Sequence, residues 1–131
     1  TKPFDPYDTP DLDLDLYAGL TFSYSGMHID SLVRTYASYV LVERPEIGPW
    51  YFSHDNKINH LDIRLELALA DFNMGYFVSC RNNLQSIYND TYYQSFPSNN
   101  PKALTMNVET VSGRAELAQI LQSLQQTLKN I

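Results

Sequence analysis

Leu61-Asp-Ile-Arg-Leu-Glu-Leu-Ala-Leu-Ala-Asp-Phe72 begins the most apolar stretch of this sequence, and the fold depends on how it is interpreted. The stretch continues to Tyr88 and holds the single cysteine, Cys80. More polar segments flank it on both sides. The hydrophobic core of the protein must therefore include it.

Two periodicities compete within this stretch. Apolar residues alternate with Arg64 and Glu66, which is the pattern of a strand with one buried face. Some of the same residues also recur at helical spacing, and Leu, Glu and Ala are strong helix formers. We favour a β-hairpin over residues 61–80, because Gly75 followed by Tyr-Phe-Val is a poor helix. A helical stretch over 61–88 is the alternative.

The segment Asp11-Leu-Asp-Leu-Asp-Leu-Tyr17 alternates acid against leucine. This period of two predicts a strand with its leucines on one face and its three carboxylates on the other. Three prolines precede it, and at their spacing they cannot enter a helix interior. Residues 1–11 are therefore expected to form an extended N-terminal arm.

Helical spacing is clear in two other segments. Apolar residues from Ile29 to Leu41 recur every three or four positions, and Pro45 ends this predicted helix near residue 43. The chain closes with a predicted helix over 113–129, for which Ser112 is a suitable N-cap.

Together these patterns predict an α+β fold. We expect an antiparallel sheet of about four or five strands, packed by the helices 29–43 and 113–129. Residues 50–52 and 103–111 are further strand candidates. A mostly helical bundle is the alternative fold. No internal repeat or composition shift divides the 131 residues, so we expect a single domain over 1–131.

The composition limits the partners of the protein. It has 9 Lys and Arg against 15 Asp and Glu, a net charge of −6 and a pI of about 4.8. Nucleic acids and anionic membranes attract basic surfaces, so neither is expected as a partner. The acidic balance favours a basic protein partner instead. A transmembrane helix needs about 18 consecutive apolar residues, and no apolar run in the sequence approaches this length. We therefore expect a soluble protein, with the cytoplasm slightly favoured.

The three histidines, His28, His54 and His60, each lie within two residues of an aspartate. Imidazole and carboxylate groups bind zinc and iron, which makes His54, His60 and Asp62 candidate metal ligands. Their spacing matches no established metal motif, so we interpret them as loop or capping residues and expect no metal or other cofactor. A single cysteine also excludes an internal disulfide and a Cys-based zinc site.

Two groups of residues are candidates for contact with a partner. The aspartates of the segment 11–17 would attract a basic surface. The alternative is that they form the solvated face of a strand, or that they keep an edge strand from pairing with another chain. The loop over 89–102 is long, almost uncharged and aromatic, as binding loops often are. Tyr36 and Tyr39 are also aromatic, and we interpret them as core or half-buried surface. The predicted partner-binding residues are Asp11, Asp13, Asp15, Tyr88, Tyr92, Tyr93 and Phe96.

The sequence contains no nucleophile elbow and no phosphate-binding glycine loop, so we favour a protein that is not an enzyme. The expected function is that of an acidic protein-binding domain that covers a basic partner, as immunity proteins, inhibitors and small secretion chaperones do. One alternative is a small metal-dependent hydrolase that uses the histidines and aspartates. Another is a structural subunit that forms a homodimer through the C-terminal helix, by way of Leu117, Leu121, Leu124 and Leu128.

Overall fold

The computed structural model describes residues 10–44 and 48–131, with only the backbone described for residues 10–12. In these ranges the chain is mainly helical, and its only sheet is a two-stranded hairpin. The predicted α+β fold with a larger antiparallel sheet is therefore wrong, and the mostly helical alternative is closer. The elements are α1 (Pro10–Gly26), α2 (Asp30–Glu43), β1 (Tyr51–Phe52), β2 (Asp55–Asn59), α3 (His60–Asn73), α4 (Phe77–Asn89), α5 (Thr91–Gln94) and α6 (Val111–Lys129).

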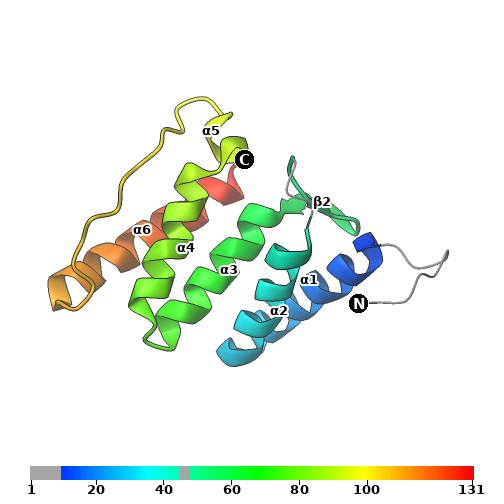
Figure 1. Cartoon of the computed structure of the whole chain (residues 1–131), viewed down its shortest axis with the longest axis horizontal. Coiled ribbons are helices and arrows are strands. Elements are labelled where there is room, and N and C mark those ends of the chain that lie inside the picture. The colour runs from blue at the N-terminus through cyan, green and yellow to red at the C-terminus, as the bar shows by residue number, and fades with distance from the viewer. Residues whose placement is uncertain (1–9, 45–47) are drawn as a thin grey trace.

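Two helix hairpins, α1–α2 and α3–α4, lie side by side, and α6 packs against α3 and α4 (Figure 1). The β1–β2 hairpin connects α2 to α3 in the chain, and an extended segment, residues 95–110, leads from α5 to α6. One hydrophobic cluster lies among α3, α4, α6 and the extended segment. A second cluster joins α1, α2 and α3 and includes Trp50. Because α3 contributes to both clusters, it is the central helix of the molecule.

The strand predicted over residues 11–17 is part of α1. Its leucines alternate with acids, but the fully buried side chains Leu14, Ala18 and Thr21 recur every three or four residues. Leu16, which a strand would bury together with Leu14, is 58% exposed. The alternation in sequence therefore does not correspond to an alternation in burial.

Pro10 begins α1. Proline suits this position because the N–H that it lacks would have no hydrogen-bond partner within the helix. The aspartates that follow it favour the positive end of the helix dipole. Pro10 and Asp11, which were predicted to end an extended arm, thus belong to the helix. Residues 1–9 of the predicted arm lie outside the described ranges.

The stretch from Leu61 to Tyr88 forms two helices in place of the predicted β-hairpin. Asn59 and Asp62 build a capping box at the start of α3. The Asn59 side chain accepts a hydrogen bond from Leu61 N at 2.9 Å, and the Asp62 carboxylate accepts one from Asn59 N at 2.9 Å. Gly75 has a φ of +81° and forms the turn to α4. Gly75 therefore separates two helices, and the strong helix formers before it prevail over the alternation.

The strand predicted over residues 103–111 does not form: residues 104–108 retain a strand-like alternation of burial but pair with no strand in the described chain, and Val111 begins α6. Met106 and Val108 are buried, whereas the residues beside them are exposed. Arg81 of α4 donates a hydrogen bond to Met106 O at 2.8 Å. Arg114 of α6 donates one to Val108 O at 2.8 Å. Side chains of two helices thus replace the neighbouring strand that the prediction required.

Both predicted helices are confirmed as α2 and α6, and the strand predicted at 50–52 is confirmed as β1, which pairs antiparallel with β2. Thr110, not Ser112, is the N-cap of α6, and its hydroxyl accepts a hydrogen bond from Gly113 N at 3.0 Å. Among the described residues, no helix has the length and apolar character needed to cross a membrane.

Candidate functional site

Four tyrosines form a continuous cluster across α1 and α2. Tyr17 and Tyr24 lie about two helical turns apart on α1. Tyr36 of α2 stacks against both, with ring centroids 6.2 Å from Tyr17 and 5.7 Å from Tyr24. The ring centroid of Tyr39 lies 5.2 Å from that of Tyr17 and 5.9 Å from that of Tyr36. We refer to these four residues as the tyrosine cluster.

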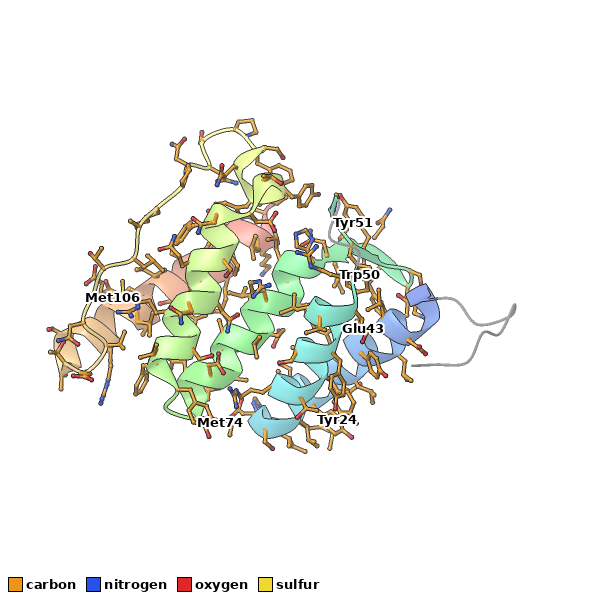
Figure 2. All side chains as sticks on the ribbon, viewed as in Figure 1. Tyr24, Glu43, Trp50, Tyr51, Met74 and Met106 are labelled. Carbon is orange, nitrogen blue, oxygen red and sulfur yellow. The ribbon has the colours of Figure 1, made fainter. Side chains whose placement is uncertain are left out.

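The tyrosine cluster lies at the surface of the α1–α2 hairpin. Tyr39 is 47% exposed, and the other three rings are half-buried. Tyr24 lies near the α1–α2 turn, at the opposite end of the hairpin from Glu43 (Figure 2). Within the described part of the chain, no hydroxyl of the cluster forms a hydrogen bond. Tyrosines that combine an apolar ring with a free polar tip are typical of protein interfaces.

A groove of about 580 Å³ follows the outer face of α1. Leu20, which lines it, lies three residues after Tyr17 and four before Tyr24, so the groove adjoins the tyrosine cluster. Gly19 leaves its floor open, because a Cβ added there would meet no atom within 4 Å. We refer to the groove as the α1 groove; it is lined by Asp13, Asp15, Leu16, Gly19, Leu20, Ser23, Phe52 and His54.

Asp15 holds the β1–β2 turn against α1 and so shapes the groove. Its carboxylate accepts one hydrogen bond from Ser53 N at 3.1 Å and another from the Ser53 hydroxyl. The rings of Phe52 and His54 pack edge to face, with centroids 5.1 Å apart. The structure thus brings two predicted partner-binding residues, Asp13 and Asp15, to one groove. The side chain of the third, Asp11, lies outside the described part.

Negative charge is concentrated on the same hairpin. α1 and α2 contain five acidic residues and a single basic residue, Arg34. Arg34 is paired internally, since its Nε donates a hydrogen bond to the Asp71 carboxylate at 2.5 Å. The hairpin therefore carries a net charge of −4, which is most of the −6 of the whole protein.

The aromatic residues predicted as a binding loop serve internal contacts. Tyr88 and Tyr93 are buried, and their rings meet edge to face at 5.7 Å. Tyr92 and Phe96 are half-buried and also in contact, with ring centroids 5.0 Å apart. A hydrogen bond of 2.8 Å between the hydroxyls of Tyr51 and Tyr92 raises the pKa of Tyr92 to about 12. None of these side chains lines the α1 groove.

The candidate metal ligands lie in three different settings. His54 borders the α1 groove, Asp62 caps α3, and His60 is buried. The Trp50 N–H donates to Nδ1 of His60 at 3.4 Å, so Nε2 carries the proton and donates to the Asp90 carboxylate at 2.9 Å. Both ring nitrogens of His60 are therefore engaged. In the described ranges, no three potential metal-binding side chains come together.

His60 and Asp90 also border a smaller hollow of about 230 Å³, together with Arg44 and Ser95. Burial lowers the pKa of His60, and the Asp90 carboxylate partly offsets this effect. A hydrolase would need a histidine nitrogen that faces a substrate or a nucleophile. Because both nitrogens are engaged by the fold, this hollow does not favour the hydrolase alternative.

The leucine stripe of α6 faces the core. Leu117, Leu121 and Leu124 are buried in the cluster formed with α3 and α4, and Leu128 packs against its edge. A homodimer through these leucines would require α6 to leave the core. The structure therefore offers no exposed leucine stripe along the described α6.

The strand predicted over residues 11–17 includes Tyr17 and so obscured its relation to Tyr24. Their spacing of seven residues puts them on one face of a helix. Tyr36 and Tyr39 fall three residues apart in a segment that was recognised as helical. This helical spacing was the signal that could have placed each pair on one face of its own helix.

Comparisons of the chain with protein-family models, with curated proteins and with solved structures find no match. The function of the α1–α2 hairpin is therefore inferred from its own geometry and charge.

Proposed function

We propose that this protein binds a basic protein partner through the outer face of the α1–α2 hairpin and acts without catalysis. The tyrosine cluster is the observation that carries the proposal. Its four adjoining rings supply a large contact area, and their hydroxyls supply polar tips that form no hydrogen bond with the described residues.

The charge of the hairpin supports a basic partner over a second copy of the chain. Two copies meeting through this face would bring together two hairpins that each carry a net charge of −4, and like charges across an interface repel. Lysine and arginine side chains of a partner would instead be attracted by the carboxylates and would form cation–π contacts with the tyrosine rings. An acidic domain that covers a basic partner is the arrangement found in immunity proteins and small chaperones.

The test is to isolate the partner from cells that produce the protein and to measure its affinity for variants. Tyr36→Ser/Tyr39→Ser removes two rings of the cluster. Tyr51→Ser/Tyr76→Ser is a matched control, because these tyrosines are 41% and 46% exposed and lie outside the cluster.

We expect a basic partner whose affinity falls at least about tenfold in the cluster variant, as for an interface hot spot. The control variant should bind within about twofold of the wild type. Association should also slow as the salt concentration rises. An acidic partner, or equal effects of the two double variants, would contradict the proposal.

A further inference from the structure

We infer that the α1 groove receives an amphipathic basic helix of the partner, with a large apolar side chain over Gly19 and a lysine or arginine beside Asp13 and Asp15. This inference rests on the proposed function and adds to it the shape and chemistry of the bound segment. Three observations support it: the course of the groove, its apolar floor and its acidic rim.

The groove follows one stripe of α1. Asp13, Leu16, Leu20 and Ser23 recur every three or four residues, so the groove runs along the helix for about 15 Å. This length corresponds to nearly three turns of a facing helix. Gly19 permits close approach at the centre of the groove, since it has no side chain and the space above it is open. An elongated groove of this kind fits a helix laid along it.

The floor of the groove is apolar and large enough for a bulky side chain. Its volume of about 580 Å³ is more than twice that of two other hollows, which have about 230 and 240 Å³. Leu16 is 58% exposed at its edge, and Phe52 forms one wall. Pockets of this size with an apolar lining and few polar groups hold the anchor residues of binding partners.

The rim determines the charge of the bound helix. Asp13 and Asp15 line the groove on α1. The hydrogen bonds from Ser53 fix the Asp15 carboxylate, whose remaining lone pairs can accept further hydrogen bonds from a cation. An apolar anchor flanked by lysine or arginine is the pattern of an amphipathic basic helix.

The inference is tested with variants that fill the groove without harming the fold. Gly19→Leu places a side chain in the open space of the groove and leaves the tyrosine cluster and every carboxylate unchanged. Gly26→Leu is the matched control, because Gly26 also lies in α1 with no atom near an added Cβ but does not line the groove. Replacing glycine within a helix favours folding, so a loss of binding by Gly19→Leu does not come from unfolding.

The probe is a synthetic helical peptide with leucines at positions i, i+4 and i+7 and lysines and arginines on the flanking faces. A second peptide has serine in place of each leucine and keeps the charge. Binding of both labelled peptides is followed by fluorescence anisotropy, and the unfolding temperature of each variant is measured in parallel.

We expect the leucine peptide to bind the wild type and Gly26→Leu alike, and Gly19→Leu at least about tenfold more weakly. The serine peptide should bind all three proteins weakly and equally. Equal binding of the leucine peptide to Gly19→Leu and Gly26→Leu would overturn the groove inference, as would no binding of that peptide to the wild type. The proposed function fails by a different result, namely unchanged partner affinity in Tyr36→Ser/Tyr39→Ser.

Discussion

Asp71 is a fully buried carboxylate that joins three helices. Arg34 Nε of α2 donates to it at 2.5 Å, and from α4 the Ser79 hydroxyl and Asn83 Nδ2 donate at 2.7 and 2.9 Å. A charge without solvent contact is tolerated only when donors satisfy it in this way. The pair has a second consequence, since it engages the single arginine of the α1–α2 hairpin and so preserves the acidic character of that hairpin.

Asp71→Ala should lower the free energy of unfolding by about 3–5 kcal/mol, because Arg34, Ser79 and Asn83 would lose their common acceptor. Asp30→Ala is the control: Asp30 accepts an exposed hydrogen bond from Asn73 Nδ2 at 3.2 Å. Its removal should cost no more than about 1 kcal/mol. Urea unfolding monitored by circular dichroism measures both losses, and equal values would show that Asp71 is not a central contact.

At the scale of the helices, the same substitution should have opposite effects at two glycines. Gly19→Ala in α1 should stabilise the protein by about 0.5–1 kcal/mol, because the added Cβ meets nothing and alanine favours a helix. Gly113→Ala in α6 should destabilise it by about 1–3 kcal/mol, because the Cβ would lie 1.7 Å from Asn107 O. Thermal unfolding of the two variants compares them directly, and shifts of the same sign would contradict the packing described at Gly113.

The elements that could be predicted from sequence are those in which one periodicity stands alone. α2 and α6 show only the helical pattern, whereas α1 and α3 contain leucines that satisfy a period of two and a helical stripe at once. Tertiary burial decided α1, in which Leu14 is buried and Leu16 is exposed. The local capping box of Asn59 and Asp62 supports the helix at α3. Residues 103–111 show the reverse, since a strand-like pattern persists where Arg81 and Arg114 bind the backbone.

The candidate site could be predicted only in part. Asp13 and Asp15 were singled out by their charge, and they do line the groove, although on a helix instead of a strand. Tyr88 and Tyr93 were singled out by composition alone, and composition does not distinguish a buried ring from an exposed one. The tyrosine cluster depends on two helices packing together, and that packing cannot be read from the spacing within either helix.

At the scale of the whole molecule, His60 is a titratable group that joins three parts of the chain. It begins α3, accepts a hydrogen bond from Trp50 N before the β-hairpin and binds Asp90 at the start of α5. Burial is the main reason that its pKa is lowered from the ordinary value of 6.5, with Arg44 and Arg64 acting in the same direction and Asp90 opposing them. The folded state therefore prefers the neutral imidazole.

This preference predicts an acid-sensitive stability. Below about pH 6.5 the unfolded chain takes up a proton at His60 before the folded chain does, so the free energy of unfolding should decrease as the pH falls from there through the folded-state pKa. His60→Gln retains a donor and an acceptor but cannot titrate, and it should flatten this decrease between about pH 7 and 5.

Asp90→Asn should act in the opposite direction, because loss of the carboxylate lowers the pKa of His60 further and extends the decrease to lower pH. Urea unfolding at a series of pH values separates the three proteins, and a decrease of unchanged slope in His60→Gln would assign the acid sensitivity to other groups.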